Sequence, residues 1–97
     1  MTSWRAEQFD LLPQSVQQRW STYGEWDDHD SFSAIVGMAV DELRRDYARI
    51  SMPWRPELNQ PNGLMHAGAI ATLVDTAVVP AIGTAYDGRR RYSTIEL

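Results

Sequence analysis

The chain contains no cysteine among its 97 residues. This absence excludes disulfide bonds, thiolate metal sites and a cysteine nucleophile. The longest hydrophobic run, 67–74, is far shorter than the ~20 residues that a helix needs to span a bilayer. The first ten residues carry no apolar core of the kind found in signal peptides. The net charge of -4 argues against general nucleic-acid binding. We therefore expect a soluble, cytoplasmic protein that binds neither nucleic acid nor membrane.

The apolar residues, 43% of the chain, are sufficient to form a core, and the length allows one domain at most. Residues 13–23 are predicted to be helical, because one apolar stripe recurs there at helical spacing. That stripe consists of Leu12, Val16, Trp20 and Tyr23. It could cover a substrate tunnel, but packing on a sheet is the simpler interpretation. The acidic segment 27–30 includes His29 and could ligate a metal ion. Because no further ligand follows nearby, we interpret it as a solvated loop and assign no metal.

Alternating apolar and polar residues predict strands over 34–42 and 47–54, paired as an antiparallel hairpin. Arg44, Arg45 and Asp46 lie between them as a polar turn. A further strand is expected to begin within 92–97. The predicted order is helix, strand, strand, long helix, strand, which indicates an α+β fold.

The most informative segment is 59–76. Pro61, Asn62 and Gly63 predict a tight turn, and a helix is expected to follow from about His66. That helix is apolar on all sides, so we expect it to lie inside a core, and Pro80 should kink or end it. Between 67 and 86 the only charged residue is Asp75.

This pattern is typical of a hydrolytic site. The first backbone N–H groups of the helix, from Ala67 and Gly68, could stabilise an oxyanion, and Asp75 could act as a general base or a nucleophile. His66 and Asp75 are nine residues apart, which corresponds to about 13.5 Å along a helix and to opposite faces. One chain therefore cannot bring both groups to the same atom. Two antiparallel copies related by a twofold axis could do so.

Each of these residues also has a structural interpretation. Asp75 could be the N-cap of a second helical segment. His66 could serve only in capping or packing, while Gly63 and Gly68 could serve only the backbone geometry.

The run Leu58–Ala77 resembles the signature of hotdog-fold acyl-CoA thioesterases of the phenylacetate-pathway (PaaI-like) group. In that pattern an Asn-Pro-x-Gly-x-x-His-Gly-Gly sequence precedes a helix that carries an acid nine positions after the His. The matching residues are Pro61, Gly63, His66, Gly68 and Asp75. The hairpin and Arg55–Leu58 also resemble the family, as does Thr94–Leu97, and the resemblance covers roughly residues 33–97.

The resemblance implies a hotdog fold, in which an antiparallel sheet wraps a long central helix, and hydrolysis of an acyl- or aryl-CoA thioester. Asp75 of one subunit would act on a carbonyl held by the Ala67 N–H and His66 of another. Thr94 would orient the water, and Gln60 falls where the family has Asn. Such an enzyme would be a homodimer or homotetramer without a cofactor, since coenzyme A is part of the substrate.

Two features of the chain differ from the family. The Gln60 side chain is one methylene longer than Asn, and Ala67 replaces a Gly while keeping its N–H donor. The family continues with several strands after Thr94, so we expect residues 31–97 to be the N-terminal part of the domain, apparently truncated after the third strand. Residues 1–30 would form an N-terminal helical extension.

Arg89 and Arg90 could bind the phosphates of coenzyme A, or belong to a solvated loop. The alternative functions are a non-catalytic acyl-CoA-binding or dimerisation hotdog domain, or an inactive fragment. A hotdog dehydratase or hydratase is less consistent with the sequence, which lacks that spacing of Asp and His.

Overall fold

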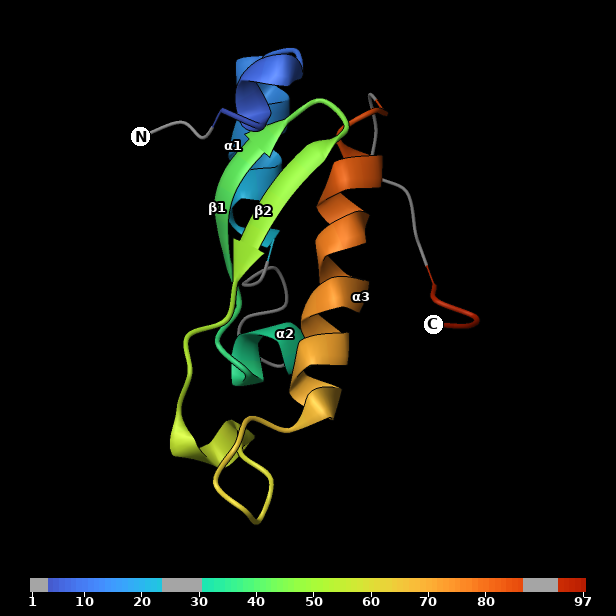
Figure 1. Cartoon of the computed structure of the whole chain (residues 1–97). Coiled ribbons are helices and arrows are strands. Elements are labelled where there is room, and N and C mark those ends of the chain that lie inside the picture. Colours follow the sequence, from blue (N-terminus) through green and yellow to red (C-terminus); the bar gives the residue numbers. More distant parts are fainter. Residues whose placement is uncertain (1–3, 24–30, 87–92) are drawn as a thin grey trace.

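The computed structural model describes residues 4–23, 31–86 and 93–97. In these ranges the chain is an α+β structure with one two-stranded antiparallel sheet and a long helix after it (Figure 1). Its elements, in chain order, are η1 (Ala6–Gln8), α1 (Gln14–Ser21), α2 (Phe32–Ile35), β1 (Ala39–Arg44), β2 (Tyr47–Ser51), η3 (Pro56–Leu58) and α3 (Ala67–Gly83).

The predicted hairpin is confirmed, although its strands are shorter than expected. The pairing runs from Ala39 opposite Ser51 to Arg44 opposite Tyr47, and the register shifts between Val40 and Glu42. This bulge leaves Asp41 without a partner in the ladder. Asp46 adopts a φ of 63° in the connecting turn, a conformation that Asp tolerates better than most residues.

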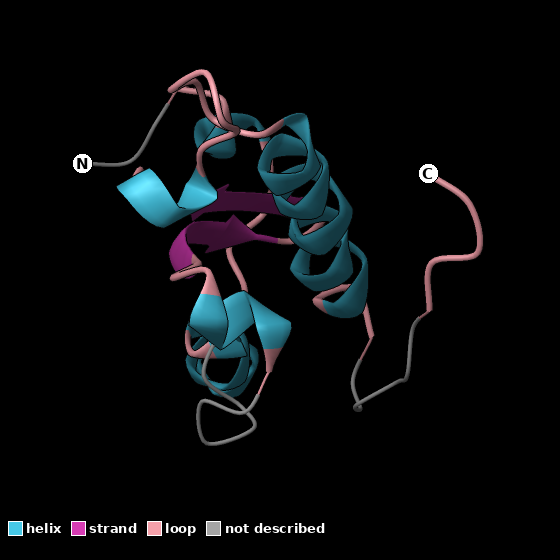
Figure 2. Cartoon of the chain, turned by 90° about the horizontal axis from the view of Figure 1, so that it is seen from below, coloured by secondary structure: helices cyan, strands magenta, loops and turns pink. Residues whose placement is uncertain are grey.

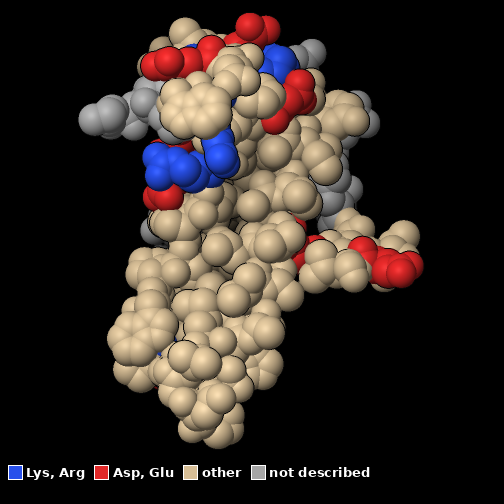
Figure 3. All heavy atoms as spheres, viewed as in Figure 1, with Lys and Arg blue, Asp and Glu red and all other residues tan. Residues whose placement is uncertain are grey.

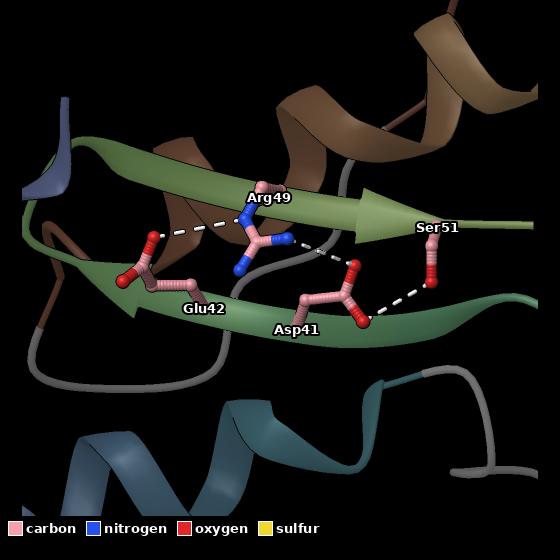
Figure 4. A network of polar contacts seen from close by, with 4 residues as sticks. All are labelled: Asp41, Glu42, Arg49 and Ser51. Carbon is pink, nitrogen blue, oxygen red and sulfur yellow. Dashed lines mark hydrogen bonds and ion pairs between the residues drawn. The ribbon is translucent and has the colours of Figure 1, made fainter. Parts of the chain in front are cut away.

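The outward face of the hairpin carries a polar network (Figure 4). The Arg49 guanidinium lies 3.8 Å from Asp41 Oδ2 and 3.6 Å from Glu42 Oε1. The Ser51 hydroxyl donates to Asp41 Oδ1 at 3.1 Å. The opposite face holds Ala48, Ile50 and Met52, which pack in the apolar clusters described below. The alternation predicted for the second strand is therefore confirmed as far as Met52.

Two apolar clusters join the hairpin to the helices. The first is centred on Val36, Met38, Met52 and Leu58, with Ala69 and Leu73 of α3 packed against it. The second is centred on Val16, Trp20 and Leu43, with Leu12, Tyr23 and Val79 against it. The stripe predicted for 13–23 therefore packs on the sheet.

The contact between α1 and α3 is very close at one point. A Cβ placed on Gly83 would lie 2.1 Å from Cζ2 of Trp20, whose side chain is almost fully buried. Only glycine lets α3 approach the indole ring so closely. The N-terminal helix is thus packed directly on the end of α3.

Three expectations about local structure are wrong. Residues 34–38 do not belong to a strand, because Ser31 caps the short helix α2 by accepting from the Ala34 N–H, and Gly37 (φ 78°) turns the chain into β1. Pro80 does not end α3, which continues to Gly83, so that part of the expectation for Pro80 is wrong. Residues 93–97 are not a strand.

The burial of α3 also differs from the expectation. One side packs on the clusters described above, while an outward stripe of Ile70, Val74, Val78 and Ile82 remains 46–55% exposed. Residues 93–97 lie beyond α3, on the side away from the strands (Figure 2). On the face shown in Figure 3, most charged side chains gather over the hairpin end of the molecule, some acidic atoms lie near mid-height on the right, and the lower end carries almost no charge. Across the described ranges, no helix is both long and apolar enough to cross a membrane.

Candidate active site at helix α3

The loop before α3 is held by its own backbone. Asn59 and Met65 form an isolated antiparallel bridge. The Gln60 N–H donates to the Leu64 carbonyl at 2.7 Å, and the Gln60 carbonyl accepts from the Gly63 N–H at 3.0 Å. Gly63 has a φ of 87°, which strains any residue with a side chain. The predicted turn is confirmed, and it fixes where α3 begins.

His66 is the N-cap of α3. Its Nδ1 accepts a hydrogen bond from the Gly68 N–H at 2.8 Å, so this nitrogen is unprotonated and Nε2 carries the proton. A Cβ on Gly68 would lie 2.9 Å from the same Nδ1. Glycine at 68 therefore leaves space for the imidazole to reach the helix start. The capping interpretation of His66 is correct, and among the residues that the structure describes Nε2–H has no acceptor, so it can donate to another group.

The His66 cap leaves some backbone N–H donors at the start of α3 occupied and others available. The Gly68 N–H is used by His66, and the Ala69 N–H donates to the His66 carbonyl at 2.9 Å. Ala67 is exposed, and within the described residues its N–H donates to no acceptor. Of the two donors expected for an oxyanion, only Ala67 is available.

Asp75 lies in the middle of the continuous helix α3, so it is not the N-cap of a second helical segment. Its side chain is half-buried, and its Oδ1 accepts a hydrogen bond from the Thr94 hydroxyl. Two predicted site residues that are 19 positions apart in sequence are therefore in direct contact. Thr94 is itself exposed.

A groove of about 760 Å³ passes beside this pair. One wall is formed by α3, including Asp75, Val78, Val79 and Ile82. The remaining described lining comes from α2, from residues 93–97 and from Tyr23 just after α1. The described lining is thus divided about equally between apolar side chains and hydroxyl-bearing side chains, with one carboxylate among them.

The start of α3 and Asp75 are separated on the same helix. Ala67 and Asp75 are eight positions apart, which corresponds to a rise of about 12 Å. A reacting carbonyl bonded to the Ala67 N–H is therefore out of reach of Asp75 in the same chain.

The structure gives less information about the other predicted site residues. Gln60 is half-buried and contributes to the loop through its backbone. Arg89, Arg90 and the acidic segment 27–30 lie outside the described residues. Within the described ranges, no group of three or more His, Cys, Asp or Glu side chains could hold a metal ion.

Sequence reasoning missed the walls of the groove. Phe32 lines it and is 62% exposed. Its position next to a capping Ser31 was the available signal, because that pair marks a helix start rather than a strand. Val79 and Ile82 were recognised only as part of an apolar helix.

No protein-family model matches this chain, no curated protein matches it, and no solved structure matches it.

Proposed function

We propose that the protein hydrolyses an acyl- or aryl-CoA thioester to the free acid and coenzyme A. The observation that carries the proposal is the hydrogen bond between Thr94 and Asp75 beside the groove. In support, the helix that holds Asp75 begins at Ala67 with an exposed N–H that has no acceptor among the described residues. These groups are the components that ester and thioester hydrolysis requires: a carboxylate, a hydroxyl that can orient water, and a donor for the oxyanion.

In the first step, the thioester carbonyl lies against the Ala67 N–H, with the His66 Nε2–H as a second donor. Asp75 accepts a proton from a water molecule held between it and the Thr94 hydroxyl, and the water oxygen bonds to the carbonyl carbon. The negative charge that develops on the carbonyl oxygen is stabilised by the two donors and by the helix dipole.

In the second step, the carbonyl re-forms and the carbon–sulfur bond breaks. The coenzyme A thiolate leaves and takes the proton that Asp75 received, which returns the carboxylate to its starting state. Direct attack by Asp75 would give a mixed anhydride that water then hydrolyses, with the same products. Either route needs no metal and no redox cofactor.

The 12 Å rise along α3 supports a site that is shared between two chains. We propose that Asp75 and Thr94 of one copy act on a carbonyl bound at Ala67 and His66 of a second copy. A twofold axis generates two equivalent composite sites. The order of hairpin, loop and long helix supports assigning the chain to part of a hotdog domain, in a homodimer or homotetramer.

The first test is release of free thiol from acetyl-, octanoyl- and phenylacetyl-CoA by the wild-type chain and two variants. Asp75→Asn is expected to reduce turnover by at least 1,000-fold, consistent with the loss of a base or nucleophile. Asp41→Asn is the matched control, because this carboxylate lies in the hairpin network and should leave turnover unchanged.

Circular dichroism and light scattering should be the same for both variants. Equal turnover by Asp75→Asn and the wild type would overturn the proposal. Binding of these thioesters without any release of thiol would instead identify a non-catalytic acyl-CoA-binding domain.

A further inference from the structure

The groove beside Asp75 is asymmetric along α3. Toward the C-terminal end of the helix its wall is formed by Val78, Val79 and Ile82, all of them apolar. Toward the helix start it is lined by Ala71 and Thr72. On α3, an apolar group attached to a carbonyl near Asp75 therefore finds its larger apolar contacts in the direction of Ile82.

The groove has a defined far end. Gly83 and Thr84, the next residues after Ile82, are both buried, and the Trp20 ring occupies the space beside Gly83. The Tyr23 side chain lines the groove and belongs to the apolar cluster that contains Trp20 and Val79. Neither Gly83 nor Trp20 lines the groove, so the apolar floor on α3 ends at Ile82.

Its length can be compared with that of an alkyl chain. Asp75 and Ile82 are seven residues apart, a rise of about 10.5 Å along the helix. An extended alkyl chain advances about 1.25 Å per carbon, given C–C bonds of about 1.5 Å and tetrahedral angles. The apolar floor therefore matches about eight carbons.

We propose that this groove binds the acyl group of the thioester, running from Asp75 toward Ile82, and that it selects medium-length acyl groups of up to about eight carbons. The inference rests on the hydrolysis proposed above for the catalytic step, but it concerns binding. Carbons beyond Ile82 would project into water and add no affinity.

The experiment measures binding of butanoyl-, hexanoyl-, octanoyl- and dodecanoyl-CoA to full-length Asp75→Asn by calorimetry, so that turnover does not interfere. We expect affinity to rise about two- to fourfold per methylene up to octanoyl, then to remain level, since each buried methylene contributes a similar increment.

Val78→Phe, introduced into the same background, should block the groove one turn after Asp75. Affinity should then stop rising at an acyl length of about four carbons. Ile70→Phe is the matched control, because Ile70 is equally exposed on α3 but does not line the groove. It should leave the profile unchanged.

Affinity independent of chain length, or the same change from Val78→Phe and Ile70→Phe, would overturn the inference. The two proposals can fail separately. Thiol release that depends on Asp75 but not on chain length removes the acyl groove alone. Affinity that rises with chain length, without thiol release by the wild type, would overturn the proposal of hydrolysis and support the acyl groove.

Discussion

The Trp20 indole occupies the space that a side chain at residue 83 would need, since a Cβ on Gly83 would lie 2.1 Å from Cζ2 of the ring. Gly83→Ala would gain about 1 kcal/mol of helix propensity. The overpacking against Trp20 should cost about 1–3 kcal/mol. We expect a net loss of stability, measured as a lower midpoint in urea.

A double-mutant cycle provides the control for this prediction. Trp20→Phe removes the ring atoms that face Gly83 and leaves a cavity, so each single variant is expected to be less stable than the wild type. The loss of stability in the double variant should be smaller than the sum of the two single losses, because alanine would fill part of the cavity. Simple additivity would show that the two residues do not constrain each other.

The cap formed by His66 should be measurable as stability of α3. His66→Ala removes the acceptor for the Gly68 N–H and should reduce the free energy of unfolding by about 1 kcal/mol. His66→Asn keeps an N-cap acceptor and is expected to lose less. Gly68→Ala should resemble His66→Ala, since its methyl group would displace the imidazole. A Gly68→Ala variant as stable as the wild type would contradict this arrangement.

Arg45 connects three segments of the chain. Its Nη1 donates to the Thr84 carbonyl at 3.2 Å, just after α3 ends, and its N–H donates to the Asp10 carbonyl at 2.9 Å. Arg45→Ala should destabilise the fold by about 1–2 kcal/mol, because a charged donor leaves a helix C-terminus. The neighbouring Arg44 makes only a 3.5 Å contact with the Phe9 carbonyl, so Arg44→Ala should change stability by less than about 0.5 kcal/mol. Chemical denaturation of both variants makes the comparison.

The proposed composite site makes a prediction about mixed oligomers. Ala67→Pro removes the N–H donor at the first helical position, where proline is well tolerated. His66, with a φ of -64° and a ψ of 134°, already has the conformation preferred before proline. Ala67→Pro and Asp75→Asn should each be inactive alone. Unfolded together and refolded as an equal mixture, they should recover roughly a quarter of the wild-type turnover, since half of the dimers contain one intact site.

Separate refolding of the same two variants, followed by mixing without exchange, is the control and should give no activity. The co-refolded sample could instead be as inactive as the control even though it is shown to contain hybrid dimers. In that case the donor and the acid do not come from different chains.

The sequence was sufficient to predict the parts of the fold that depend on local pattern. Alternation from Ala48 to Met52 gave the second strand, and the turn at Gly63 gave the start of α3. Alternation failed at Val36 and Met38, where two buried residues flank a glycine turn rather than lie in a strand. The capping Ser31 and the left-handed Gly37 were visible in the sequence but were outweighed by the apolar period.

The exposure of α3 was not predictable, because a helix apolar on every side gives no indication of which side packs. Its orientation is set by tertiary contacts such as those of Gly83 with Trp20, of Leu73 with the first cluster and of Val79 with the second. The proximity of Thr94 to Asp75, 19 residues away, cannot be obtained from spacing. It was expected only from the resemblance to a family.

The two ends of α3 are anchored differently. At Thr84 the helix is held by Arg45 from the hairpin turn and by Trp20 from α1, whereas at His66 it begins on an exposed loop held mainly by its own backbone. Any backbone movement that accompanies binding of a molecule should therefore take place near His66, while the region around Ile82 stays in place. The rigid end near Ile82 would limit the size of a ligand, and the loop at His66 would adjust to its shape.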